Sequence, residues 1–231
     1  GLCVGYDRRF LSDISAKWAC EVFAYEGVHV KLINRAAPTP LIMYTVKSMD
    51  FPYGMAMTAS HNPAIYNGVK VFTEGGRDAE DSVSRSLEQY IELREGEPVD
   101  ILPYEKGILS GIIEEINPMN DFIDSIISFL DMKAIRDRGL KVVLDPMFGV
   151  SQTSLQTILM TARCEVDVIN SRRDTLFGGK LPTPNVDTLK DLTDYVVRHG
   201  RDIGIATDGD ADRLGVINDK GEKGDANEAV I

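Results

Sequence analysis

The feature of this sequence that most constrains its fold is an alternation of strand-like and helix-like segments that occurs twice. In the amino-terminal part, a short apolar run at 2–4 precedes a helical segment that ends near Glu26, and residues 28–33 then alternate between apolar and polar side chains. Alternation of this kind is typical of a strand, whereas apolar residues three or four apart indicate a helix. Strands that alternate with helices favour a largely parallel sheet covered by helices.

The alternation starts again after residue 140. Residues 141–144 form an apolar run that ends at an aspartate, and further strands are expected at 165–169 and 203–206. Helical spacing of apolar residues is expected between these strands. We therefore predict an α/β fold that consists of two tandem α/β/α domains with mixed, largely parallel sheets.

The boundary between the two domains is expected in a polar segment at 131–139. An irregular stretch at 96–117 leads into a strong apolar stripe at helical spacing, and the polar segment follows that stripe. Polar segments without periodicity are typical of links between folded parts. We predict a first domain at 1–132 and a second at 133–231.

The overall charge excludes some classes of partner. The 231 residues include 36 acidic and 25 basic side chains, which gives a formal net charge of −11. An acidic chain repels a phosphate backbone, so we expect no nucleic-acid partner. No apolar run approaches the roughly 20 residues of a membrane span, so we expect no membrane partner. The three scattered cysteines (Cys3, Cys20 and Cys164) indicate reduced thiols of a cytoplasmic protein, most simply as small core residues.

Three aspartates at alternate positions directly follow the strand expected at 203–206. Asp208, Asp210 and Asp212 would repel one another strongly unless they bind a cation, and oxygen ligands favour Mg²⁺ or Ca²⁺ over zinc. A calcium-binding EF-hand loop would require glycine where Arg213 stands and glutamate where Asp219 stands, so that interpretation fails. The remaining alternative to a metal site is an acidic turn that faces solvent.

A second polar cluster follows another short apolar strand. Ser60 and His61 lie within the segment 58–63, and Lys70 comes ten residues after the serine. A serine beside a histidine is compatible with a nucleophile and its base. Taken alone, the pair is more often a capping serine and a loop histidine.

Four motifs, taken together, resemble the α-D-phosphohexomutases, the phosphoglucomutase and phosphomannomutase superfamily. They are Gly-Tyr-Asp-Arg-Arg at 5–9, Thr-Ala-Ser-His-Asn-Pro at 58–63, Tyr-Asn-Gly-Val-Lys at 66–70 and Asp-Gly-Asp-Ala-Asp-Arg at 208–213. All four occur in the order found in that family, which makes chance agreement remote.

The resemblance implies a role for each matching residue. Ser60 would carry a phosphoryl group. The ligands of a Mg²⁺ ion would be the oxygens of Asp208, Asp210, Asp212 and phosphorylated Ser60. Proton transfer and charge stabilisation beside the phosphoserine would fall to His61 and Lys70. Contacts to the substrate and its phosphate would come from Tyr6, Arg9 and Arg213.

The implied function is that of a Mg²⁺-dependent isomerase of the phosphotransferase type. Such an enzyme interconverts a sugar 1-phosphate and a sugar 6-phosphate through the phosphoserine and a bound sugar 1,6-bisphosphate. Family members have four domains, and this chain would supply the first two, so we expect domains III and IV to be missing and turnover by this part alone to be small. The choice among glucose, mannose, glucosamine and pentose phosphates stays open. The alternative is a non-catalytic phosphosugar-binding relative or binding module of the same fold.

Overall fold

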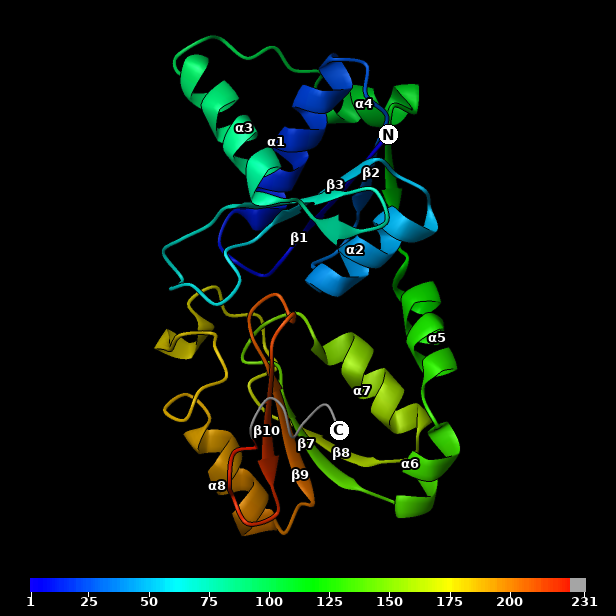
Figure 1. Ribbon diagram of the computed structural model, residues 1–231, viewed down its shortest axis with the longest axis vertical. Coiled ribbons are helices and arrows are strands. Elements are labelled where there is room, and N and C mark those ends of the chain that lie inside the picture. Colours follow the sequence, from blue (N-terminus) through cyan, green and yellow to red (C-terminus); the bar gives the residue numbers. More distant parts are fainter. Residues whose placement is uncertain (225–231) are drawn as a thin grey trace. The chain divides into compact units, whose positions relative to one another are not determined.

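The computed structural model describes residues 1–224, which fold into two compact units (Figure 1). The first unit consists of Gly1–Tyr6, Leu11–Thr58 and Gly68–Pro118. The second consists of Asp7–Phe10, Ala59–Asn67 and the chain from Met119 onward. Two loops whose flanking segments belong to the first unit, at 7–10 and 59–67, are therefore parts of the second.

The first unit contains a six-stranded sheet with the strand order β5-β4-β3-β1-β2-β6. Its strands are β1 (Leu2–Tyr6), β2 (Val30–Ile33), β3 (Tyr53–Met57), β4 (Val69–Thr73), β5 (Arg77–Asp78) and β6 (Ile113–Ile116). The four strands β3, β1, β2 and β6 are parallel, whereas β4 is antiparallel to both β3 and β5. The sheet is thus mixed and largely parallel, as predicted.

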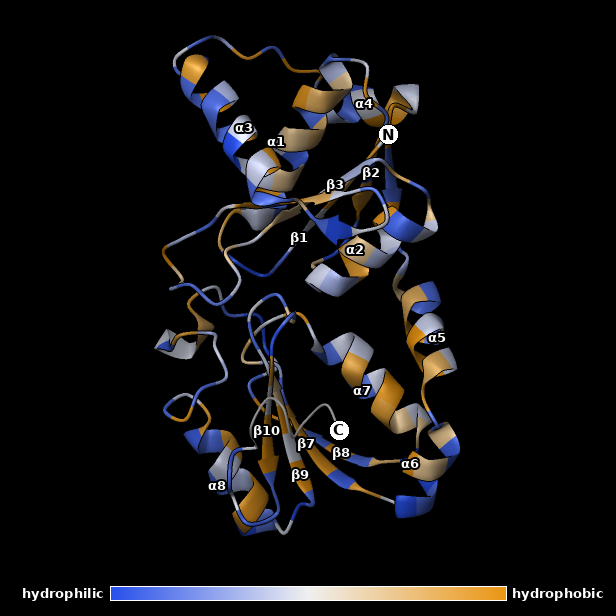
Figure 2. Ribbon diagram, viewed as in Figure 1, coloured by the Kyte–Doolittle hydropathy of each residue, from blue (hydrophilic) through white to orange (hydrophobic). Residues whose placement is uncertain are grey.

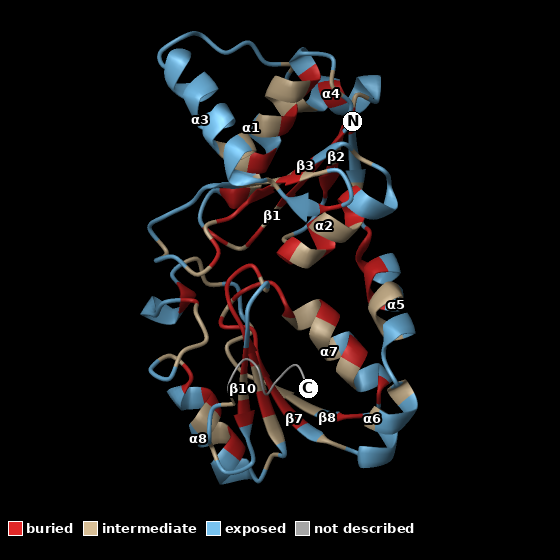
Figure 3. Cartoon of the chain, viewed as in Figure 1, coloured by how far each residue is buried: buried red, intermediate tan, exposed pale blue. Residues whose placement is uncertain are grey.

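Helices cover both faces of this sheet (Figure 1). The helices of this unit are α1 (Ser12–Tyr25), α2 (Thr39–Ser48), α3 (Asp81–Leu93) and α4 (Tyr104–Ser110), and of these α1, α2 and α4 pack against strands of the sheet. Because successive residues of a strand point to opposite faces, Leu2 and Val4 of β1 join one core cluster with Cys20 of α1. Gly5 faces Ile42 of α2 so closely that a Cβ on the glycine would overlap the isoleucine. Helix α3 contributes no buried residue, and Figure 3 shows most of it exposed.

The second unit contains a four-stranded sheet with the order β10-β9-β7-β8. The elements of this unit are α5 (Met119–Phe129), α6 (Met132–Arg138), β7 (Lys141–Asp145), α7 (Gln152–Thr161), β8 (Glu165–Val168), the 3₁₀ turn η1 (Phe177–Gly179), α8 (Lys190–His199), β9 (Ile203–Thr207) and β10 (Leu214–Asn218). Strand β7 is parallel to β8 and β9, and β10 returns antiparallel to β9. Figure 2 shows apolar residues along the central strands β7 and β9.

Two apolar clusters cover opposite faces of the second sheet. Val143 of β7 packs with Leu192 and Val196 of α8, whereas its neighbour Val142 packs with Ala162 at the end of α7. The alternation along β7 therefore places one helix on each face. This layering confirms the predicted α/β/α fold class.

The structure also adds elements that the sequence pattern did not indicate. The stretch at 96–117, expected to be irregular, contains α4 and the edge strand β6, and the polar segment at 131–139 contains α6. A boundary between domains at residue 132 stays a prediction. All three cysteines are buried free thiols. In residues 1–224, no helix combines the length and the apolar character that crossing a bilayer would require.

Candidate functional site

The three predicted metal ligands lie at the tip of the β9–β10 hairpin. The register pairs Thr207 with Leu214, so the loop from Asp208 to Arg213 connects the two strands. The carboxylate of Asp208 organises this loop, because its Oδ1 accepts hydrogen bonds from the backbone N–H groups of Asp212 and Arg213, both at 3.1 Å. A short side chain that binds the backbone of its own turn is a common way to fix such a loop.

The carboxylates of this loop converge. One oxygen from each of Asp208, Asp210 and Asp212 lies within 4.8 Å of the others. Asp208 and Asp210 are fully buried and Asp212 is exposed. Burial, followed by repulsion from the other two carboxylates, raises the pKa of Asp208 to about 7. Three convergent carboxylate oxygens fit a hard divalent cation such as Mg²⁺, which would relieve this repulsion.

Ser60 lies against this acidic loop, although 148 residues separate it from Asp208 in the sequence. It belongs to the loop that follows β3, and its backbone has the left-handed φ of 51°. The Oγ atom of this buried serine donates a hydrogen bond of 3.0 Å to Oδ2 of Asp208. Nδ1 of His61 lies 3.4 Å from the same Oγ. The structure thus brings the predicted nucleophile and the predicted metal loop together within the second unit.

The arginines of the predicted site differ in their surroundings. Arg9 is fully buried, and both of its terminal nitrogens donate hydrogen bonds to carbonyl oxygens of the loop that contains Ser60. Arg213 is exposed at the end of the aspartate loop. Arg8, the neighbour of Arg9 in the sequence, was not assigned a phosphate contact; it is partly exposed and donates to the carbonyl oxygen of Ser171 at 2.9 Å.

Two other predicted site residues belong to the first unit. Tyr6 is the last residue of β1, and Lys70 lies on β4 opposite Ala56 of β3. Their predicted contacts with substrate and phosphoserine stay predictions.

Three residues of the site were given no role from the sequence. Asp7 pairs with Arg9, and its position inside the Gly-Tyr-Asp-Arg-Arg motif was the available signal. The ring of Phe177 lies 5.0 Å from the Arg9 guanidinium carbon, and nothing in its loop sequence indicated this. Gly209 approaches Ser60 so closely that a Cβ would lie 2.8 Å from the serine carbonyl oxygen. This close approach explains why a glycine separates the first two aspartates.

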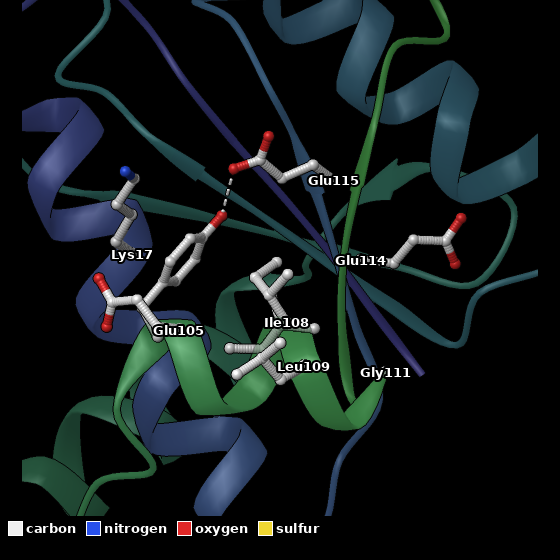
Figure 4. Close-up of a pocket in the computed structure, with 9 residues that line it drawn as sticks. Lys17, Glu105, Ile108, Leu109, Gly111, Glu114 and Glu115 are labelled. Carbon is white, nitrogen blue, oxygen red and sulfur yellow. Dashed lines mark hydrogen bonds between the residues drawn. The ribbon is translucent and has the colours of Figure 1, made fainter.

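A groove in the first unit contains none of the predicted site residues (Figure 4). It is lined by parts of α1, α4 and β6. Among the lining residues, Tyr104 donates a hydrogen bond of 2.7 Å to Oε1 of Glu115, and the Lys17 ammonium lies 4.8 Å from the tyrosine ring centre. Burial and the adjacent carboxylate raise the pKa of Tyr104. We assign no ligand to this groove.

The known proteins that this chain resembles are named as sugar-phosphate mutases. The chain is 33% identical over 219 residues to a probable phosphoglucosamine mutase from Methanobrevibacter smithii. The aligned region covers 95% of this chain and 47% of that protein. The chain is 32% identical to a phosphoglucosamine/phosphogalactosamine mutase from Sulfurisphaera tokodaii, with the same coverage. A putative phosphomannomutase from Thermus thermophilus superimposes with a TM-score of 0.84 at 27% identity, over 96% of this chain and 49% of that one. The chain therefore spans about half the length of these relatives.

Two family models match successive parts of the chain. Residues 1–96 match the alpha/beta/alpha domain I of phosphoglucomutase/phosphomannomutase, and residues 120–221 match domain II. These matches include all four motifs and both sheets apart from the edge strand β6. The chain belongs to the phosphoglucomutase/phosphomannomutase family.

Proposed function

We propose that this chain supplies the phosphoryl-transfer centre of a phosphohexomutase, which interconverts a sugar 1-phosphate and a sugar 6-phosphate. The observation that carries the proposal is the hydrogen bond between Ser60 Oγ and Asp208 Oδ2. This hydrogen bond holds the buried hydroxyl of Ser60 beside three convergent carboxylates, which supports the role of nucleophile that we assign to this serine. That combination suits phosphoryl transfer, which depends on positioning and charge stabilisation more than on covalent chemistry by the protein.

Phosphorylated Ser60 starts the proposed cycle. Its phosphoryl group passes to a free hydroxyl of the sugar monophosphate: the Oγ–P bond breaks, a new O–P bond forms on the sugar, and the hydroxyl proton leaves to a base. The resulting sugar 1,6-bisphosphate reverses its orientation in the site and returns its other phosphoryl group to Ser60. Mg²⁺ held by the aspartate loop would supply positive charge to the phosphoryl group during both transfers.

The chain's own residues divide the remaining work. His61 stands close enough to Ser60 Oγ to exchange a proton with it, given that its Nδ1 lies 3.4 Å away. We assign Lys70 to charge stabilisation and Arg213 and Tyr6 to contacts with substrate phosphate, on the strength of the family motifs. Arg213 is exposed at the end of the aspartate loop, so its positive charge is accessible to an anionic substrate.

The sugar is proposed to be a hexose phosphate. Relatives named phosphoglucosamine mutases favour an amino-sugar phosphate as the first compound to test. Sugar selection and the grip on the non-reacting phosphate are assigned to domains III and IV of the family. The cytoplasmic location stays part of the proposal.

Phosphoryl uptake tests the nucleophile. The protein would be incubated with Mg²⁺ and either glucose or glucosamine 1,6-bisphosphate, and its intact mass measured. We expect one added phosphoryl group on the unmodified chain and none on Ser60→Ala. Normal uptake by Ser60→Ala would exclude Ser60 as the nucleophile. Absence of uptake by the unmodified chain with either sugar would show that this part does not load alone, and the same test on a chain that includes domains III and IV then separates a binding-only relative from a part that needs those domains.

Calorimetry tests the metal site separately. Asp210→Asn removes a buried charge from the cluster and should weaken Mg²⁺ binding. Asp219→Asn is the matched control, because Asp219 is an exposed aspartate on the turn after β10, outside the cluster. Equal Mg²⁺ affinity of the two variants would place the metal elsewhere.

A further inference from the structure

Arg9 is a fully buried cation beside the proposed nucleophile. It belongs to the second unit together with the loop at 59–67. Nη1 donates to the carbonyl oxygens of Pro63 and Tyr66 at 2.9 and 3.0 Å. Nη2 donates to those of Ser60 and Asn62 at 2.6 and 2.7 Å. One guanidinium group therefore binds four carbonyls of a single loop.

The N–H donors of the Arg9 side chain are largely used within the protein itself. A guanidinium group carries five N–H donors and no acceptor. Four are used by the carbonyls, and the nitrogen that carries the fifth, Nε, lies 3.3 Å from Oδ2 of Asp7. Asp7 in turn is held by the Arg9 backbone N–H, which donates to its Oδ1 at 2.9 Å. The ring of Phe177 lies against the guanidinium, 5.0 Å from its central carbon. Both terminal nitrogens of Arg9 are thus fully used by the loop, whereas Nε is buried, forms no hydrogen bond with residues 1–224 and is paired with Asp7 by charge alone.

The loop that Arg9 binds needs such support. Ser60 has a left-handed backbone, which costs a non-glycine residue of the order of 1 kcal/mol and persists only where the surroundings hold it. The carbonyl oxygen that Arg9 binds most closely is that of Ser60 itself. The same residue directs its Oγ at Asp208. Fixing this peptide group therefore fixes the direction of the nucleophile.

We infer that Arg9 is a positioning residue that holds the Ser60 loop through four carbonyl hydrogen bonds, and that it does not bind the transferred phosphate. This inference rests on the proposed function for its activity readout only. It differs from the phosphate contact that the family resemblance implies for Arg9. Lysine distinguishes the two roles, because its ammonium group can still bind a phosphate as a point charge. It lacks the planar fork with which arginine reaches four carbonyls at fixed positions.

Amide hydrogen exchange tests the inference without any turnover. In Arg9→Lys, amide exchange in residues 59–67 should accelerate about tenfold or more, as expected from losing hydrogen bonds to a charged group. Amides in β7 and α8, which Arg9 does not contact, serve as the internal control. Unchanged exchange at 59–67 would overturn the inference, and it would do so even if the proposed function had failed.

Uptake kinetics give the second readout. Arg9→Lys and Arg9→Met should slow phosphoryl uptake to a similar degree, while the bisphosphate concentration at half-saturation stays within about twofold of the unmodified chain. Arg213→Met, at the residue assigned to phosphate, should raise that concentration instead. Near-normal uptake by Arg9→Lys with a raised half-saturation would assign Arg9 to phosphate binding and overturn the inference.

A measurement on the unmodified chain covers the case in which neither Arg9 variant folds. Proton NMR of the arginine side chains should show Nη protons of Arg9 that exchange with water far more slowly than those of the exposed Arg213. Equal exchange rates for the two arginines would mean that the carbonyl contacts do not hold in solution, which would overturn the inference.

Discussion

Substitution of Gly209 by alanine should disturb the site without removing any functional group. A Cβ on Gly209 would lie 2.8 Å from the Ser60 carbonyl oxygen and 3.4 Å from the Phe177 ring. Ordinary contact begins near 3.4 Å, so the oxygen and the Cβ must separate by about 0.6 Å. The oxygen is not free to move, because Nη2 of Arg9 holds it at 2.6 Å.

The cost of this overlap can be estimated from overpacked cores. Inserting one carbon into a closely packed site destabilises a protein by about 1–3 kcal/mol. Gly209 has no left-handed φ, so the overlap and not backbone strain accounts for the loss. We expect Gly209→Ala to lower the free energy of unfolding by about 1–2 kcal/mol in a urea titration, after allowing for the gain of up to about 1 kcal/mol that alanine brings through the unfolded chain. Phosphoryl uptake by Ser60 should slow as its carbonyl is displaced.

Gly224→Ala is the matched control for this substitution. Its Cβ would have no neighbour closer than 3.9 Å, and its φ is also outside the left-handed region. The control should therefore unfold within about 0.5 kcal/mol of the unmodified chain. If Gly209→Ala were as stable as Gly224→Ala and took up phosphate at the normal rate, the close approach of the two loops would be refuted.

Three further outcomes are expected. Saturating Mg²⁺ should raise the midpoint of thermal unfolding of the unmodified chain, and Asp210→Asn should abolish most of that rise, because a ligand that binds only the folded state stabilises it; an equal rise in both would argue against the carboxylate cluster. Burial raises the pKa of Asp145 from 3.8 to about 6, so protonation of this carboxyl group favours the folded state. The resulting contribution to the free energy of unfolding is complete below pH 3.8 and is lost as the pH rises through 6. Between pH 4 and pH 8, the unmodified chain should therefore lose roughly 3 kcal/mol of unfolding free energy, measured in urea, beyond any loss seen in Asp145→Asn. Parallel pH profiles of the two proteins would contradict this. Leu192→Ala, in the core against β7, should cost about 2–5 kcal/mol of unfolding free energy, and a loss below about 1 kcal/mol would mean that the core is not packed as described.

Much of the fold could be predicted because periodicity reports burial. Strand β7 is buried on both faces, β9 is buried on one face and partly buried on the other, and both strands therefore have the sequence of a short apolar run. The edge strand β6 was not predicted, because its sequence Ile-Glu-Glu-Ile is short and contains two exposed glutamates. Its strand conformation depends on pairing with β2, which no local pattern records.

The candidate site was predictable in its chemistry and less so in its geometry. Alternating aspartates after a buried strand indicated a metal site because like charges must be compensated. That Ser60 lies against Asp208 followed only from the family resemblance, since no rule of spacing connects residues so distant in sequence. The surroundings of Arg9 were beyond sequence reasoning, because an arginine that binds backbone carbonyls depends on the path of another loop and not on that loop's side chains.

The division of the chain between the two units has a consequence for folding. The loops at 7–10 and 59–67 belong to the second unit, while the residues on either side of each belong to the first. Contacts between such distant segments form slowly, since the entropy of closing the intervening chain is lost before the contact forms. The geometry around Ser60 should therefore mature late during refolding, after secondary structure is complete. A chain that begins at residue 119 would retain the aspartate loop and yet have no group to phosphorylate at this position.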